Sequence, residues 1–155
     1  MSVFILLFSI FTALQTVDEP SSNADLLLME RNLSDYIWDK RLLIISSDRD
    51  SDLLVEQLTL LSEVTNDLEE RDLVVIQVSG YRSFALFGDA VAPAAKGLKD
   101  KFSLGKSQNY KAILVGKDGT VKQRWETVFD PTDLFTIIDA MPMRIRELDS
   151  SVSEQ

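Results

Sequence analysis

The segment that decides the fold is Ala112–Leu148, which reads AILVGKDGTVKQRWETVFDPTDLFTIIDAMPMRIREL. It opens with an apolar run typical of a buried strand, followed by GKDG at Gly116–Gly119. Asp-Gly supplies the positive φ that a tight hairpin turn requires. Val121–Glu126 then alternates as a second strand with one solvated face. Pro131 is placed to start a helix and Pro142 to end it, so the segment predicts a β-hairpin followed by a helix.

Two apolar runs upstream, Arg41–Ser46 and Asp72–Ser79, predict strands that are buried on both faces. Between them, Leu and Val recur at positions 54, 58, 61, 64 and 68, which predicts one helix ending near Glu70. Strand, helix and strand form a crossover, so the two strands should be parallel. The whole order is β-α-β and then β-hairpin-α. It predicts an α/β fold of the thioredoxin-like class, a mixed sheet with helices on both faces.

The remaining segments carry weaker patterns. We expect a helix over Ala94–Phe102, and the rest of 80–109 yields no assignment. The apolar run Val3–Leu14 would rise roughly 18 Å as a helix, short of the ~30 Å hydrocarbon core of a bilayer. That length fits the apolar part of a secretory signal. An uncleaved anchor or a buried N-terminal segment are the alternatives.

We therefore divide the chain into four parts. Residues 1–16 are a predicted signal peptide, and 17–37 a linker and lead-in segment. Residues 38–148 form the thioredoxin-like domain, and 149–155 a polar tail. This division predicts an exported protein, periplasmic or extracellular, with no stable membrane span after processing.

Composition excludes several kinds of chemistry. The 155 residues have a net charge of −9, which argues against a nucleic-acid partner. The chain has no Cys and no His. It therefore lacks thiol nucleophiles, disulfides, Cys/His metal sites and the usual general base near neutral pH. We predict no catalytic residue, no metal site and no cofactor. Any catalysis would depend on Asp, Glu, Lys, Tyr, Ser or Arg.

The loop that carries the redox pair in thioredoxins follows the first strand. Here that loop is Ser46–Asp52 and contains no Cys, and Tyr110 enters the third strand without the usual Pro. Thiol–disulfide exchange needs a thiolate, so this composition excludes it. We expect the acidic residues of the loop to cap the next helix and interact favourably with its dipole.

Four stretches resemble a known family: WDKRLLIISSDRDSDLLVEQ, LEERDLVVIQV, AILVGKDGTVKQRW and FTIIDAMPMRIREL. They are similar to the blocks of a thioredoxin-like domain family of unknown function, of the DUF4174 type. The resemblance covers about Trp38–Leu148. It implies export, because this family occurs as small exported bacterial proteins and as a domain of animal extracellular-matrix proteins with sushi repeats. It implies no established activity.

The basic residues concentrate near the hairpin and the C-terminal end of the domain. They form a candidate interaction face for an exported protein or a polysaccharide: Lys117, Lys122, Arg124, Arg144 and Arg146. The alternative is structural. Lys117 and Lys122 would then solvate the hairpin, while Arg144 pairs with Asp139 or binds helix carbonyls.

Three aromatic residues, Trp38, Tyr110 and Trp125, present a similar choice. They could form a ligand platform, but aromatic residues at strand positions are usually core, and we expect that here. The resulting hypothesis is an exported, non-catalytic domain that binds a protein or glycan. The alternatives are an enzyme based on carboxylates or Lys, which needs a pocket with two groups of shifted pKa, or a purely structural partner subunit.

Overall fold

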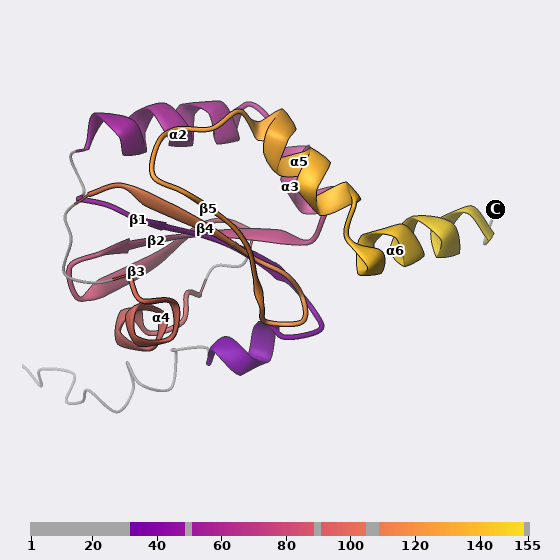
Figure 1. Cartoon of the computed structure of the whole chain (residues 1–155), viewed down its shortest axis with the longest axis horizontal. Helices are drawn as coiled ribbons and strands as arrows, with labels where there is room; N and C mark the ends of the chain where they lie inside the picture. Colours follow the sequence, from indigo (N-terminus) through magenta and orange to yellow (C-terminus); the bar gives the residue numbers. More distant parts are fainter. Residues whose placement is uncertain (1–31, 49–50, 89–90, 105–108, 154–155) are drawn as a thin grey trace, which may run out of the picture.

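The computed structural model describes residues 32–48, 51–88, 91–104 and 109–153 (Figure 1). The predicted signal peptide and most of the predicted lead-in lie outside the described residues. The elements are η1 (Leu33–Tyr36), β1 (Arg41–Ser46), α2 (Asp52–Ser62), α3 (Thr65–Glu70), β2 (Leu73–Ser79), β3 (Arg82–Phe87), α4 (Ala95–Phe102), β4 (Lys111–Val115), β5 (Val121–Trp125), α5 (Pro131–Asp139) and α6 (Pro142–Ser153).

The strands form one mixed sheet in the order β3-β2-β1-β4-β5. β1 and β2 are parallel, with Arg41 opposite Leu73 and Ser46 opposite Val78, as the predicted crossover requires. β4 is antiparallel to β1, β5 to β4, and β3 to β2. The predicted α/β class and the mixed sheet are confirmed.

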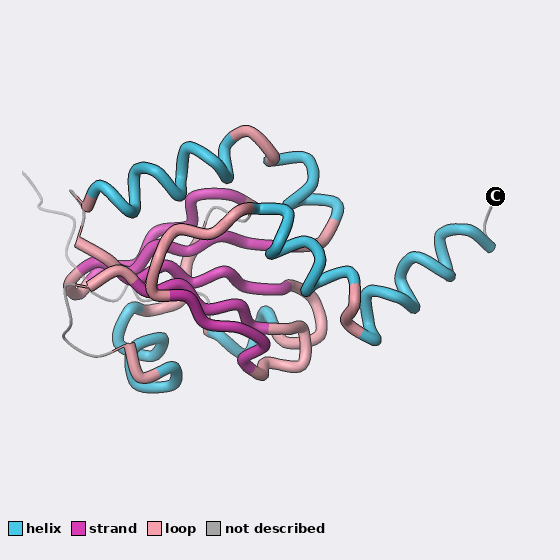
Figure 2. Tube along the Cα trace, turned by 45° about the horizontal axis from the view of Figure 1, so that its top comes forward, coloured by secondary structure: helices cyan, strands magenta, loops and turns pink. Residues whose placement is uncertain are grey.

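Helices cover both faces of this sheet. In Figures 1 and 2, α2, α3 and α5 lie on one side, and η1 and α4 on the other. Leu43 and Ile45 of β1 belong to the first core, whereas Leu42 and Ile44 belong to the second. Successive side chains of a strand point to opposite faces. Because both faces are covered, β1 consists of a continuous apolar run.

The hairpin turn is built as its sequence predicts. Gly119 has φ 73, and the Gly116 N–H donates to the carbonyl oxygen of Thr120 at 2.9 Å. A Cβ atom at Gly119 would lie 3.2 Å from the side chain of Ile37. The turn therefore packs closely against the segment between η1 and β1, and this contact fixes one corner of the candidate site.

The helix predicted from residue 54 to Glu70 is broken in two. Val64, at φ −124 and ψ 29, separates α2 from α3. Just before the break, the hydroxyl of Ser62 donates to the carbonyl of Thr59, and the hydroxyl of Thr59 to that of Val55. Such bonds compete with the helical ladder. The predicted apolar stripe survives the break, since Leu68 is buried.

The predicted helix over Ala94–Phe102 is present as α4. Two other elements, β3 and α6, differ from the sequence expectations. β3 occupies part of the segment that yielded no assignment. Where we expected a charged exit and a polar tail, the structure has α6. Pro142 is its first residue, a position that tolerates proline because no N–H is needed there. It therefore separates α5 from α6, and α6 extends away from the sheet (Figure 2).

Candidate functional site

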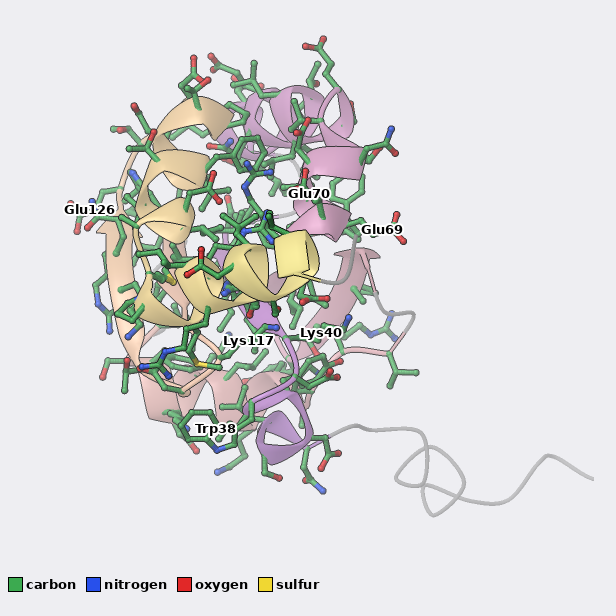
Figure 3. All side chains as sticks on the ribbon, turned by 90° about the vertical axis from the view of Figure 1, so that its right-hand side faces the viewer. Trp38, Lys40, Glu69, Glu70, Lys117 and Glu126 are labelled. Atoms are coloured by element: carbon green, nitrogen blue, oxygen red, sulfur yellow. The ribbon has the colours of Figure 1, made fainter. Side chains whose placement is uncertain are left out.

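A cluster of charged side chains occupies the end of the sheet where β1 and β2 begin. We call it the charged cluster and define it as Lys40, Arg41, Arg71, Lys117 and Arg144 with Glu70, Asp72, Asp139 and Glu147. Figure 3 views the molecule from this end, with Lys40, Glu70 and Lys117 labelled. The thioredoxin-type reactive loop, which follows β1, lies at the opposite end.

Glu147 of α6 is the carboxylate that joins this helix to the sheet. Arg41 is fully buried and donates through Nη2 to both carboxylate oxygens of Glu147, at 3.1 and 3.2 Å. The Lys117 ammonium lies 2.8 Å from Glu147 Oε1 and 2.8 Å from Asp72 Oδ2. Lys40 contacts the other oxygen of Asp72 at 3.2 Å. Each buried charge in this half of the cluster therefore has an opposite charge beside it.

The second half of the cluster joins α3, α5 and α6. Asp139 accepts two hydrogen bonds from Arg71, at 3.0 and 2.8 Å, and one from Arg144 at 3.3 Å. Arg144 also donates to the backbone carbonyl and the carboxylate of Glu70, at 3.0 and 2.6 Å. The Arg71 guanidinium lies 4.4 Å from the ring centre of Phe135. Two arginines thus bind the ends of three helices together.

The carboxyl pKa values reflect this pairing. Burial alone would raise the pKa of Asp72, but the hydrogen bonds and charges of Lys117 and Lys40 lower it below its ordinary value. For Glu147, burial is likewise outweighed by Lys117 and Arg41, and the pKa is lowered. Asp139 has a lowered pKa for the same reason, with Arg71 and Arg144 as its partners. All three carboxylates are therefore ionised at neutral pH.

The structure distributes the five predicted basic residues differently from a single free face. Lys117 and Arg144 lie inside the charged cluster, with 10% and 6% of their side chains exposed. Lys122 pairs with Asp118 of the same hairpin at 2.7 Å. Arg124 donates to the carbonyl of Phe102 at 3.2 Å, and Arg146 is exposed.

The structural alternative is therefore confirmed for Arg144, which pairs with Asp139. It is wrong for Lys117, because this ammonium does not solvate the hairpin but is buried against Asp72 and Glu147. Binding of a partner by the remaining basic residues stays a prediction.

Trp38 lies beside the charged cluster and is 68% exposed. Its φ is 70, in the left-handed region that bulky residues rarely adopt. Its backbone N–H donates to the backbone carbonyl of Lys117 at 2.6 Å. Our expectation that Trp38 is core is wrong, because the residue occupies a bend before β1 and not a strand position. For Tyr110, which is buried, the expectation is confirmed. Trp125 is only partly buried; it stacks on Phe129 and packs against the core.

A cavity of about 480 Å³ opens beside the cluster, between α3 and the β2–β3 pair. Lys40, Glu69 and Asp72 line its polar part, and leucines and Phe87 its apolar part. An acid–base enzyme would need a carboxyl whose pKa is raised toward neutrality. The pKa of Asp72 is shifted the opposite way, by two lysines, so the cavity does not favour the carboxylate enzyme.

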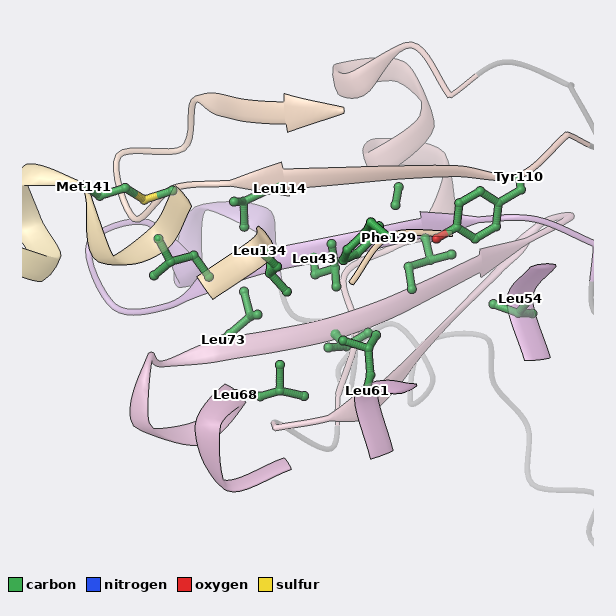
Figure 4. Packing of buried hydrophobic residues seen from close by; sticks show 14 residues of the cluster. Leu43, Leu54, Leu61, Leu68, Leu73, Tyr110, Leu114, Phe129, Leu134 and Met141 are labelled. Carbon is green, nitrogen blue, oxygen red and sulfur yellow. The ribbon is translucent and has the colours of Figure 1, made fainter. Parts of the chain in front are cut away.

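The opposite end of the sheet, where the reactive loop of thioredoxins lies, is filled by a polar contact that our sequence reading missed. The buried Gln57 side chain donates to the carbonyl of Phe129 at 3.1 Å and accepts from its N–H at 2.9 Å. The Tyr110 hydroxyl donates to the same amide oxygen at 3.0 Å. Figure 4 shows Tyr110 and Phe129 within this core. Burial raises the pKa of Tyr110, which keeps the hydroxyl protonated as a donor.

Ser47, which directly follows β1, is buried, and its hydroxyl has no hydrogen-bond partner among the described residues. A serine nucleophile needs an adjacent base to activate it. In the described part of the chain no base is hydrogen-bonded to the Ser47 hydroxyl. That part of the chain also contains no group of three acidic side chains arranged to bind a metal ion, and none of its helices is long and apolar enough to cross a bilayer.

The model of a domain of unknown function, DUF4174, matches residues 32–147. The chain belongs to the DUF4174 family. Relatives of this DUF4174 chain include the sushi repeat-containing protein SRPX of Homo sapiens, 30% identical over 121 residues, and SRPX of Rattus norvegicus, 30% identical over 122. These alignments cover 75% of the chain and 26% of each relative, so the chain spans about a quarter of their length.

Solved structures similar to the DUF4174 chain include peroxiredoxins. A thioredoxin peroxidase I of Plasmodium yoelii matches with a TM-score of 0.53 at 14% identity, over 74% of this chain and 79% of that one. The reduced 2-Cys peroxiredoxin of Plasmodium vivax matches with 0.54 at 12%, over 74% and 72%. At these identities the likeness concerns the fold alone. The fold is thioredoxin-like, as the order of elements predicts.

Proposed function

We propose that this DUF4174 domain is an exported, non-catalytic binding module whose contact surface is centred on Trp38. The observation that carries the proposal is an exposed indole on a left-handed backbone. That conformation costs about 1–2 kcal/mol for a residue with a Cβ atom. The exposed indole gains no packing energy from the domain that would offset this cost. Strained residues cluster at functional sites.

The surroundings of Trp38 fix the position of its backbone. The hydrogen bond to the Lys117 carbonyl fixes its backbone, and Ile37 packs against the hairpin at Gly119. Lys117 is in turn fixed by two carboxylates of the charged cluster. An aromatic side chain has only two rotatable bonds, so it loses little conformational entropy when a partner covers it. The indole presents a flat apolar face and one N–H donor, a combination that suits a sugar ring or an apolar protein side chain.

Two further features support the parts of the proposal. The polar contact of Gln57, Tyr110 and Phe129 fills the end of the sheet where thioredoxins carry their redox pair, which favours a non-catalytic role. The apolar run Val3–Leu14 favours export.

Expression of the full chain with a C-terminal tag tests export directly. We expect the secreted or periplasmic product to begin after residue 16 by mass spectrometry; a product that keeps Met1 in the cytoplasm contradicts it.

Binding can be tested with a matched pair of aromatic substitutions. Tyr81 is also fully exposed, but it follows β2 and therefore lies at the opposite end of the sheet from Trp38. The wild-type protein, Trp38→Ala and Tyr81→Ala are applied to chitin, cellulose and heparin resins and are used to capture proteins from a periplasmic or secreted extract. We expect one of these resins or one captured protein to bind wild type and Tyr81→Ala equally well. Binding of Trp38→Ala to the same resin or protein should be at least tenfold weaker.

Equal retention of Trp38→Ala and wild type would show that the indole is not the contact. Circular dichroism of the three proteins shows whether a loss of retention is due to unfolding instead. Removing an exposed side chain should leave the domain folded.

A further inference from the structure

Helix α6 turns its charged face toward the protein. Arg144 and Glu147 are three residues apart and share one side of the helix. Arg144 binds Glu70 and Asp139, and Glu147 binds Arg41 and Lys117. The helix is therefore attached to the domain mainly by ion pairs, at fixed positions in its first two turns.

The apolar side chains of α6 point to solvent. Ile145, Leu148 and Val152 are 47%, 40% and 77% exposed. Their spacing of three and then four residues places them on one stripe. Figure 1 shows the helix extending away from the sheet, so the body of the domain does not cover this stripe. A surface helix normally buries its apolar face, and the reverse arrangement marks a protein contact.

We propose that α6 pairs with α6 of a second copy of this chain, antiparallel about a two-fold axis that passes between Leu148 and Asp149. In this register Ile145 faces Val152 of the second copy, and the two Leu148 side chains meet at the axis. Each apolar residue of the stripe then has an apolar counterpart, as the self-complementary interface of a two-fold dimer requires.

Charges beside the stripe fit the same register. Arg146 and Asp149 are three residues apart and lie on one flank of the helix. In the antiparallel pair, Arg146 is level with residue 151 of the second copy along the helix axis. Asp149 of that copy is two residues further along, roughly 3 Å at the rise of an α-helix. Two symmetric Arg146–Asp149 ion pairs can therefore form.

The stripe has only three apolar side chains, and this sets the strength of the pairing. Stable interfaces bury about 800 Å² per partner, more than three such side chains provide. We therefore expect a weak, concentration-dependent dimer. The ion pairs add specificity more than affinity, because exposed pairs contribute little.

Analytical ultracentrifugation of the full chain from about 10 µM to 1 mM tests the pairing. We expect a monomer–dimer equilibrium, with Leu148→Asp raising the dissociation constant at least tenfold. Val55→Asp is the matched control, since Val55 is an exposed aliphatic residue on α2, and it should leave the equilibrium unchanged. Arg146→Asp should weaken the dimer about threefold, and the double variant Arg146→Asp/Asp149→Arg should restore it.

Three results would overturn the proposal. The wild-type chain could be monomeric at every concentration, in which case the stripe binds something other than a second copy, such as a groove on another protein. A dimer could persist unchanged in Leu148→Asp, which would place the interface elsewhere. The charge-reversed double variant could dimerise no better than Arg146→Asp, which would exclude the antiparallel register. Circular dichroism confirms in each case that the variant is folded.

Discussion

At the scale of single residues, Trp38 combines exposure with a strained backbone. Replacing it by Gly removes the side chain and the strain, whereas Ala removes the side chain and keeps the strain. We expect Trp38→Gly to be about 1 kcal/mol more stable than Trp38→Ala in urea unfolding, because only glycine accepts φ 70 without a steric cost. If the glycine variant unfolds at the lower urea concentration, the backbone at Trp38 is not strained.

Gln57 is the residue on which the opposite end of the sheet depends. Gln57→Leu would leave the backbone N–H and carbonyl of Phe129 and the Tyr110 hydroxyl without their partner. We expect a loss of about 3 kcal/mol in the free energy of unfolding, since buried polar groups without partners are costly. Gln123→Leu, on the exposed side of β5, is the control and should change stability by less than about 0.5 kcal/mol. Equal effects of the two substitutions would contradict the role of Gln57.

Local pattern carries a signal for Gln57 but none for Trp38 or Lys117. Gln57 is three positions after Leu54, on the buried face of α2, and a polar residue at that spacing is the signal that predicts a buried hydrogen bond. The exposure of Trp38 has no such signal, since it results from a backbone conformation that the hairpin imposes from about eighty residues away. The burial of Lys117 depends in the same way on Glu147, which is distant in sequence.

At the scale of elements, the charged cluster distinguishes structural arginines from free ones. Arg144→Glu would place a carboxylate against Glu70 and Asp139, whereas Arg146→Glu changes an exposed position on the same helix. We expect the first substitution to destabilise the protein by about 3–5 kcal/mol or to prevent folding. The second should cost less than about 0.5 kcal/mol. Chemical unfolding of both variants measures the difference, and similar values would show that Arg144 is not structural.

The elements that the sequence predicted well are those buried on both faces. β1 and β2 are continuous apolar runs, and the Asp118-Gly119 turn specifies the hairpin between β4 and β5. β3 is an edge strand whose residues are mostly half-buried, so it shows neither a continuous nor an alternating apolar pattern. α6 was not predicted because its inward residues are charged. Their partners belong to distant elements, and no local rule relates them.

At the scale of the whole molecule, the two ends of the sheet have different roles. The end where β1 stops and α2 begins is closed by apolar packing and the Gln57 contact, and the chain has no Cys to occupy the position that thioredoxins use. The other end has the ion pairs of Lys40 and Glu147, together with Trp38 and the cavity beside Asp72. The charged cluster and Trp38 thus lie at the end of the sheet opposite to the one that holds the reactive loop in thioredoxins. Because of this difference between the two ends, the surface seen in Figure 3 is the first to test for binding partners.

The charged cluster also sets how the whole molecule responds to acid. The pKa values of Asp72, Asp139 and Glu147 are lowered in the folded state, so their pairing stabilises the protein at neutral pH. That contribution falls as the pH drops through the ordinary pKa values of the carboxyls, 3.8 for Asp and 4.5 for Glu, and is lost once the folded carboxyls are protonated.

Because the chain has no His, the free energy of unfolding should be nearly flat between about pH 6 and 8. Urea unfolding at a series of pH values should therefore show stability that declines only below about pH 5. Glu147→Gln should have a shallower acid decline than wild type, and an identical decline would mean that Glu147 does not link α6 to the sheet.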